Sequence, residues 1–231
     1  MQRGRYHHGD LRHALIEAAL EIIDSEGTEA LTIRRLAKEV GVSHAAPAHH
    51  FPDKTAIILA VATEGFRILG RRLQSTMAIA DARDRLTEIG RNYCRFAFEH
   101  PAHYAIMFGP HKTQLVEHDE EFHQVASGAF NVLLKVVTPL VARPEDGEEE
   151  RFRRAGAASM SCWTHVHGTV MLWESNMLDQ GRERSWDDFE PMVENAIYFL
   201  AENIEHFARH PTVHAVPIPS SPEFCPPDDE S

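Results

Sequence analysis

Apolar residues recur every three or four positions along most of the chain, a spacing typical of amphipathic α-helices. No segment alternates apolar and polar residues between hairpin turns, as a half-buried β-strand would. The pattern therefore predicts an all-α fold of about nine helices. The first covers residues 10–25; the others are expected to begin at Thr32, Ser43 and Asp53 and to cover 83–99, a segment from Pro101, 119–141, 151–178 and 187–209.

Composition changes along the chain and suggests three parts. The short helices are expected within residues 1–55 and the long ones within residues 56–210. Residues 211–231 contain six of the 13 prolines, separated by small and acidic residues. Such a segment has too little apolar content to form a packed core. We therefore predict an N-terminal domain over 1–55, a helical domain over 56–210 and a disordered proline-rich tail over 211–231.

The most informative segment is Thr32–Lys54, which reads TIRRLAKEVGVSHAAPAHHFPDK. Ala37 is small enough for a second helix to cross closely, and Gly41 can adopt the positive φ that ends a helix. Thr32 and Ser43 are suitable caps for the two helices. Two short helices joined by such a turn form a helix-turn-helix, whose second helix enters the major groove of DNA.

Three pieces of the N-terminal quarter resemble the DNA-binding domain of the TetR family of transcriptional regulators. They are AALEIIDSEG (residues 18–27), LTIRRLAKEVGVS (31–43) and HFPDK (50–54). Farther along, HYAIMFGP (103–110) and WTHVHG (163–168) are similar to the effector domain of a subgroup with a Trp-His-Gly element. The resemblance implies a helical regulator that binds an operator in double-stranded DNA and responds to a small molecule.

The resemblance also assigns a DNA-binding surface, residue by residue. Segment 43–50 corresponds to the recognition helix, in which His44, Ala45 and His49 would touch base edges. Lys54 would meet a phosphate near the amino end of the next helix, where the helix dipole favours an anion. The complete predicted set is Thr32, Arg34, Ser43, His44, Ala45, His49, His50 and Lys54.

Two residues depart from the family pattern. Ala48 stands where the family usually has tyrosine, so a hydroxyl-to-phosphate hydrogen bond is missing. Pro47 lies inside the expected recognition helix, where it removes one N–H donor and crowds the carbonyl of Ser43. Because only one intrahelical bond is lost, we expect distortion of this helix rather than its disruption.

The whole chain has a net charge of −12, which by itself would disfavour DNA binding, but this charge is unevenly distributed. Residues 1–55 carry seven Lys and Arg against eight Asp and Glu, which leaves −11 for residues 56–231. Attraction to phosphates acts over about 8 Å at physiological salt, so nearby basic groups matter most. The alternative is a merely solvated basic face. The motif favours DNA contact for Arg34, Arg35, Lys38 and Lys54, with Arg3 and Arg5 as an arm.

Two long helices offer candidate dimer contacts. One has an apolar stripe and the other carries small side chains that permit close approach. The same stripes could instead face the chain's own core. The resemblance favours a homodimer with a four-helix interface. The stripe residues are Phe189, Met192, Val193, Ala196, Leu200 and Ile204, and Ala155, Ala158, Ser159, Cys162 and Val166.

Aromatic, methionine and histidine residues gather in two segments, 93–108 and 163–171. Apolar pockets with a few polar groups are typical small-molecule sites, although the same residues could simply fill a core. By family resemblance we predict a small apolar or amphipathic effector. Its expected contacts are Tyr93, Phe96, His103, Tyr104, Met107, Phe108, Trp163, His167 and Met171.

Other functional classes lack supporting motifs. The chain has no Gly-x-Ser-x-Gly elbow, phosphate-binding loop or dinucleotide fingerprint, so an enzyme is not predicted. Sixteen histidines suggest a metal-responsive regulator as an alternative, yet no metal-ligand pattern accompanies them, and no metal site or cofactor is predicted. A helical adaptor that does not bind DNA is the other alternative. Three widely spaced cysteines and the lack of a membrane-length apolar run favour a cytoplasmic protein without a membrane partner.

Overall fold

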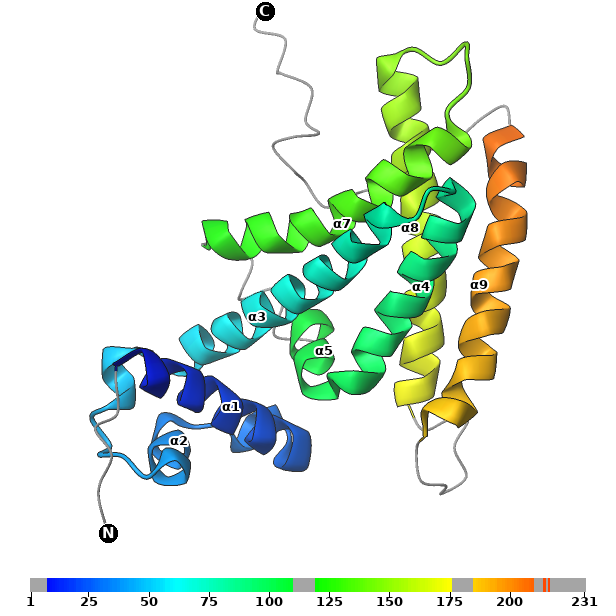
Figure 1. Ribbon diagram of the computed structural model, residues 1–231. Coiled ribbons are helices and arrows are strands. Elements are labelled where there is room, and N and C mark those ends of the chain that lie inside the picture. The colour runs from blue at the N-terminus through cyan, green and yellow to red at the C-terminus, as the bar shows by residue number, and fades with distance from the viewer. Residues whose placement is uncertain (1–7, 110–118, 176–184, 210–213, 215, 217–231) are drawn as a thin grey trace, which may run out of the picture. The chain divides into compact units, whose positions relative to one another are not determined.

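The computed structural model describes residues 8–109, 119–175, 185–209, 214 and 216 (Figure 1). Within these residues every regular element is helical, which confirms the predicted all-α fold. Eight α-helices and three short 3₁₀ helices are described there, close to the nine helices expected. They are α1 (His8–Glu26), η1 (Thr28–Ala30), α2 (Ile33–Val40), η2 (Pro47–His49), α3 (Lys54–Ser75), η3 (Thr76–Ala78), α4 (Ala82–Glu99), α5 (Pro101–Phe108), α7 (Glu120–Val141), α8 (Glu148–Glu174) and α9 (Trp186–Arg209).

The chain divides into two compact units. Unit 1 comprises Met1–Phe66 and His100–His123, and unit 2 comprises Arg67–Glu99 and Gln124–Ser231. Helices α3 and α7 each contribute residues to both units. The predicted tail over 211–231 lies outside the described residues, apart from residues 214 and 216.

Unit 1 is built around α1, which contacts α2 and α5. The apolar face expected for the first helix is buried, since Leu15 and Ala19 are fully enclosed. Leu36 and Ala37 of α2 are also fully enclosed. The burial of Ala37 is compatible with the close helix crossing predicted there, and that crossing stays a prediction.

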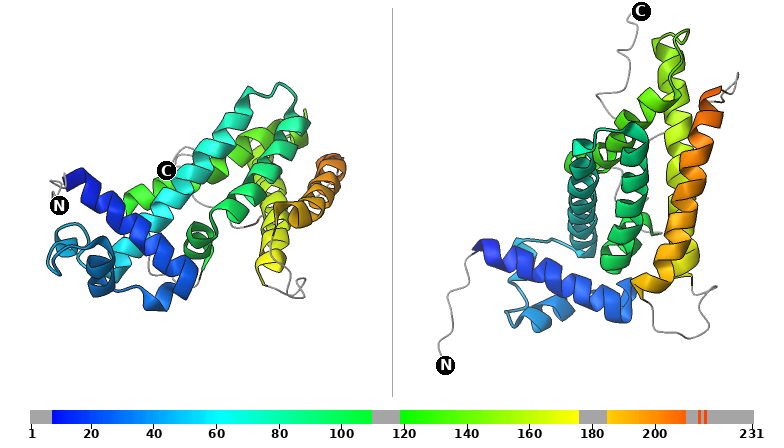
Figure 2. Two further views of the ribbon diagram at one scale, coloured as in Figure 1. Left: turned by 60° about the horizontal axis from the view of Figure 1, so that its bottom comes forward. Right: turned by 45° about the vertical axis from the view of Figure 1, so that its right-hand side comes forward.

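In unit 2, α4, α8 and α9 pack against one another in all three pairs. Figures 1 and 2 show α9 running antiparallel to α8 along most of its length. This packing buries the stripes considered as dimer contacts, so most of their residues face the chain's own core. The buried members are Ala155, Ala158, Ser159, Cys162, Val166, Phe189, Val193, Ala196 and Ile204, whereas Met192 and Leu200 are half-buried.

Helix α7 is long and apolar enough, by length and composition, to cross a membrane. The expectation that no segment reaches this length is therefore wrong for α7. More than half of its most apolar window is buried within the protein, including Leu134, Val136 and Val137. The same composition is found in core helices of soluble proteins, and this burial is what such a core helix shows.

Candidate DNA-binding surface and effector site

Helix α2 is fixed at both ends by local hydrogen bonds. At its start, the Thr32 hydroxyl oxygen accepts a bond from the Arg35 N–H at 3.1 Å, as predicted. At its end, Gly41 adopts φ 73° and donates to the Lys38 carbonyl at 3.2 Å, while the N–H of Val42 donates to Ala37 at 2.9 Å. This pair of bonds is a Schellman motif, which a left-handed glycine permits. The turn of the predicted helix-turn-helix is therefore present.

The recognition segment differs from the expected α-helix over residues 43–50. Residues 44–46 form a turn, and only Pro47–His49 form a short 3₁₀ helix, η2. Pro47 has no N–H to donate to the Ser43 carbonyl, and that carbonyl instead accepts from Ala46 at 3.0 Å. The cap of η2 is Ala46 rather than Ser43, so the predicted Ser43 cap is wrong. Most bonds here join residues three apart, as in a 3₁₀ helix, although the Phe51 N–H donates to the Pro47 carbonyl four residues back at 2.8 Å.

The predicted DNA-contacting residues lie mostly at the surface of unit 1. His50 and Lys54 are half-buried, and Ala48, where the family usually has tyrosine, is exposed. Pro47 is buried and packs inward, so it contributes to the core rather than to a contact surface. The exposed members of the predicted set are Thr32, Arg34, Ser43, His44, Ala45 and His49.

Acidic side chains engage two of the basic residues near this surface. Arg35 pairs with Glu26 at 2.7 Å, and its second pair is with Glu39 at 3.6 Å. The Lys54 ammonium lies 4.0 Å from the carboxylate of Glu29. Exposed pairs of this kind contribute little to stability, about 0–1 kcal/mol, so a phosphate can replace the carboxylate.

The start of α3 is capped by Asp53, the residue at which this helix was expected to begin. The Asp53 carboxylate accepts a hydrogen bond from the N–H of Ala56 at 2.8 Å. Lys54 is the first residue of this helix, so its ammonium group belongs to the helical end where an anion is favoured. The preceding Phe51 is buried, and the Arg12 guanidinium lies 5.3 Å from its ring centroid.

Three residues of the predicted effector site form a hydrogen-bonded cluster in unit 2. Trp163 donates its indole N–H to the Tyr93 hydroxyl at 3.2 Å, and that oxygen lies 2.7 Å from Nδ1 of His167. An indole N–H can only donate, so Tyr93 accepts from Trp163 and has its own proton to offer His167. Phe130 of α7 packs edge-on against Trp163, with ring centroids 6.0 Å apart. Phe96, also predicted, is fully buried in the same unit.

Four other predicted effector residues lie on α5 in unit 1. His103, Tyr104 and Met107 are buried, and Phe108 is half-buried. The Tyr104 and Phe108 rings lie 4.9 Å apart. The predicted set is thus divided between the units, in two separate groups. Met171, expected as a pocket wall, is 49% exposed at the surface of unit 2.

Sequence reasoning missed the exposed apolar residues of α8 and α9, which are together called the exposed apolar surface. Tyr198 and Phe199 are 70% and 55% exposed, and Met171 and Leu172 are each about half exposed. The His165 ring stacks on Phe199 with centroids 5.2 Å apart. Tyr198 and Phe199 fall outside the buried stripe of α9, so its apolar residues occupy two faces. The second apolar face of α9 is visible in the sequence and could have indicated this exposed surface.

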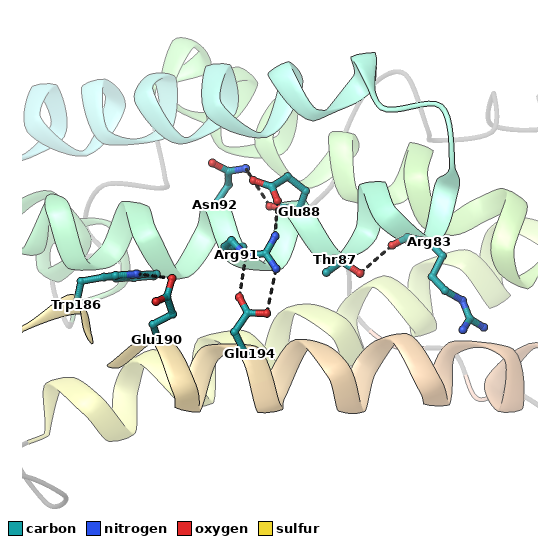
Figure 3. Close-up of polar contacts among 8 residues, drawn as sticks. All are labelled: Arg83, Thr87, Glu88, Arg91, Asn92, Trp186, Glu190 and Glu194. Atoms are coloured by element: carbon teal, nitrogen blue, oxygen red, sulfur yellow. Dashed lines mark hydrogen bonds and ion pairs between the residues drawn. The ribbon is translucent and has the colours of Figure 1, made fainter. Parts of the chain in front are cut away.

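Ion pairs join α9 to α4, and Figure 3 shows the one between Arg91 and Glu194. The Arg91 guanidinium binds both carboxylate oxygens of Glu194, at 2.7 and 3.0 Å, and also bonds to Glu88. A second ion pair joins the same two helices, with Nη1 of Arg83 3.7 Å from Oε1 of Glu202. The bond from Arg91 lowers the pKa of Glu194, so this carboxylate stays ionised. Bidentate geometry fixes orientation as well as distance, and so holds α9 in place.

A buried ion pair was also missed. Arg154 of α8 is 1% exposed, and its Nε donates to Asp146 at 3.0 Å. Its Nη2 donates to Glu150 at 3.1 Å, and the backbone N–H of Arg143 donates to Asp146 at 3.1 Å. Three of the four residues lie between the helices expected over 119–141 and 151–178, where the sequence predicted no regular element. Glu148–Glu150 are instead the first turn of α8.

Metal-binding and thiol chemistry have little support in the described parts of the chain. No three His, Cys, Asp or Glu side chains there are grouped to hold a metal ion. Cys94 and Cys162 are buried, and burial raises the pKa of each thiol to about 12. Both cysteines are therefore unreactive thiols at neutral pH.

Comparison with known proteins identifies the family. Residues 15–61 match the family described as "Bacterial regulatory proteins, tetR family", which includes the capped α2 and the Gly41 turn. Residues 86–195 match the "Tetracyclin repressor-like, C-terminal domain". The chain belongs to the TetR family. It is therefore a transcriptional regulator with a helix-turn-helix DNA-binding domain, and homodimers and ligand binding are typical of its relatives.

Individual relatives are distant. An uncharacterised HTH-type transcriptional regulator of Mycobacterium tuberculosis is 24% identical over 199 residues, which span 86% of this chain and 84% of that protein. The regulator BetI of Brucella suis is 38% identical over 71 residues, only 31% of this chain and 36% of BetI. A Rhodococcus sp. RHA1 protein of unknown function is similar in structure, with a TM-score of 0.69 and 25% identity over 88% of this chain and 98% of that chain.

Proposed function

We propose that this TetR-family protein is a ligand-responsive repressor, released from a palindromic operator by a small apolar or amphipathic molecule. The capped α2 and the Schellman turn at Gly41, which present the exposed recognition segment, carry this proposal. Regulators of this family are typically cytoplasmic, and we propose that location. The alternative of a non-DNA-binding adaptor predicts that neutralising Arg34 or Lys54 leaves function intact.

The proposed DNA contacts are the predicted residues whose side chains are exposed or half-buried on unit 1. His44, Ala45 and His49 are assigned to base edges, and they are exposed on the turn and on η2. Phosphate contacts are assigned to Thr32, Arg34, His50 and Lys54, with Ser43 beside them. The Thr32 oxygen accepts the cap bond, yet its hydroxyl proton can still be donated to a phosphate.

The proposed dimer uses the exposed apolar surface of α8 and α9. A single helix-turn-helix meets too few bases for useful specificity, so two copies on a palindrome are needed. Tyr198 and Phe199 supply aromatic area of the kind that dominates protein interfaces. The Arg91–Glu194 ion pair holds α9 against α4 and so keeps the exposed side chains of α9 in a fixed orientation.

We propose that the effector binds to the predicted contact residues, of which one group belongs to unit 1 and the other to unit 2. The Tyr93–Trp163–His167 cluster supplies polar groups beside aromatic rings, with Tyr93 buried and Trp163 and His167 half-buried, and small-molecule sites combine such groups. An effector changes DNA affinity only as far as it binds one conformation more tightly, and typical couplings are about 1–3 kcal/mol.

Selection of random duplex DNA by the purified protein at physiological salt tests the function. Sequencing of the bound fraction is expected to recover a palindrome with two half-sites. If a folded dimer enriches no sequence, the repressor proposal is wrong and the adaptor alternative gains support.

Replacing Lys54 with alanine is expected to weaken binding to every DNA sequence. Each lost phosphate contact lowers the slope of log affinity against log salt by about one unit, so the loss is about one unit per half-site. Glu29→Gln should strengthen binding, because Glu29 lies 4.0 Å from the Lys54 ammonium and competes with the phosphate. Fluorescence anisotropy across a salt series measures both effects.

Lys135→Ala on α7 is the matched control, since Lys135 is an exposed lysine outside the proposed surface. It should leave affinity and slope unchanged. An equal loss in the Lys54 and Lys135 variants would mean that overall charge, rather than a phosphate contact, is responsible.

A further inference from the structure

His103 is a buried polar side chain whose Nε2 has no hydrogen-bond partner. The residue lies on α5 in unit 1 and is only 7% exposed. Such atoms are rare in folded proteins, because a polar group removed from water without a partner costs free energy. Either a ligand or another polar group is expected to meet this nitrogen.

Helix α3 has no side chain at Gly65, and Met107 and His103 of α5 lie against its backbone there. A Cβ at residue 65 would lie 2.4 Å from Sδ of Met107 and 3.2 Å from Cβ of His103. Met107 therefore occupies the space that a side chain at residue 65 would take. An unbranched thioether side chain adopts other rotamers readily, so its movement would open space beside His103.

Aromatic rings gather on the helices that carry Gly65 and His103, and the His100 ring lies 5.7 Å from the His103 ring. Phe66 makes edge-on contacts with Phe108 at 5.7 Å and with Phe122 at 5.6 Å. Helix α5 carries no Lys, Arg, Asp or Glu. Burial lowers the pKa of His103 to about 4, so its imidazole is neutral at physiological pH and carries one donor and one acceptor nitrogen.

We propose that His103 is the polar anchor of the effector, and that the effector is an uncharged aromatic molecule bearing a hydroxyl group. A hydroxyl can donate or accept, so it satisfies Nε2 in either tautomer of the imidazole. The rings of Phe66, Tyr104 and Phe108 offer edges and faces to an aromatic body. A carboxylate or ammonium group would lose hydration with no opposite charge on α5, so charged molecules are disfavoured. This inference rests on the proposed ligand-responsive function.

Calorimetric titration with three probes of equal ring size tests the proposal. The probes are 1-naphthol, 1-methylnaphthalene and 1-naphthoate, which differ only in the group on the ring. The full-length protein is expected to bind 1-naphthol at least tenfold more tightly than either other probe, since a buried polar group discriminates strongly against analogues that leave it unpaired. Absence of naphthol binding, or preference for the naphthoate, would overturn the proposal.

Three variants assign the preference to one side chain. His103→Leu should abolish the preference for 1-naphthol over 1-methylnaphthalene, while His103→Gln, which keeps a donor and an acceptor, should retain part of it. His13→Leu is the matched control, because His13 is an exposed histidine of the same unit. Persistence of the preference in His103→Leu would overturn the assignment.

The thermal midpoint of the ligand-free His103→Leu protein separates an anchor from a structural histidine. We expect the midpoint to stay constant or rise, because the variant removes an unpaired polar atom. A fall of many degrees would show that Nε2 is already satisfied, and would overturn the proposal. Binding is measured without DNA, so naphthol binding without a recovered operator would refute only the repressor function, and the reverse result only the effector class.

Discussion

Arg154→Met is expected to lower the free energy of unfolding by about 3–5 kcal/mol, because it removes one partner of a buried ion pair. Arg154 is 1% exposed and donates to Asp146 and Glu150 at 3.0 and 3.1 Å. The variant leaves the Asp146 carboxylate buried without its partner Arg154, although the Arg143 N–H still donates to it. Urea denaturation at neutral pH, followed by circular dichroism, measures the loss.

Two further variants show whether pairing is the cause. Glu145→Ala removes an exposed carboxylate next to Asp146 and should change stability by less than about 0.5 kcal/mol. The double variant Asp146→Leu with Arg154→Met removes both charges and should recover much of the loss, since apolar residues can replace a buried pair. The single variant Asp146→Leu completes the comparison, and a double variant whose loss equals the sum of the losses in Arg154→Met and Asp146→Leu would contradict the pairing explanation.

The destabilisation should depend on pH. Burial alone would raise the pKa of Asp146, but hydrogen bonds from the Arg143 N–H and from Arg154 hold it below the ordinary value. A lowered folded-state pKa means that the stabilisation is present above the ordinary carboxyl pKa and is lost as pH falls through the folded value. The difference between wild type and Arg154→Met should therefore be largest near neutral pH and shrink in acid.

Local features were predictable from the sequence because the interactions that fix them are local. The Thr32 cap joins residues three apart, and the Gly41 motif closes within five residues. Helix existence followed from apolar spacing, and the family motifs placed the DNA-binding domain. The distortion at Pro47 was expected from its missing N–H, but the sequence did not reveal that tighter bonds would replace the whole α-helix with η2.

Contacts between distant segments were less accessible. Tyr93 and Trp163 were both predicted as effector contacts, but nothing in a spacing of 70 residues shows that one donates to the other. The partners of Arg154 depend on how the segment before α8 folds back. The division of the effector residues between two units likewise depends on chain topology rather than on motif.

The dimer stripes show a third kind of limit. Any amphipathic helix must bury one face, and periodicity does not say whether the partner is the same chain or a second copy. The stripe that includes Phe189 and Val193 packs within unit 2, so the remaining apolar residues Tyr198 and Phe199 become the informative ones. Only the observed burial distinguishes the apolar residues that pack within the chain from those left exposed for a second copy.

Phe199→Arg is accordingly expected to dissociate the dimer and to abolish specific operator binding. Phe199 is 55% exposed and stacks on His165 at 5.2 Å, beside Tyr198, which is 70% exposed. Near the two-fold axis of a symmetric interface, the substitution would place two like charges in a desolvated region. Loss of an aromatic anchor costs about 2 kcal/mol or more, roughly 30-fold in the dimer dissociation constant.

The effect on DNA should be larger still, because two linked half-sites bind about 10²–10⁴-fold more tightly than one alone. Light scattering after size exclusion measures the dimer, and anisotropy with the selected palindrome measures operator affinity. Lys135→Glu on α7 reverses the charge of an exposed residue of the same unit and should leave both unchanged. If Phe199→Arg remains a dimer with wild-type affinity, another surface joins the two copies, because a chain held together elsewhere would tolerate an arginine on this face.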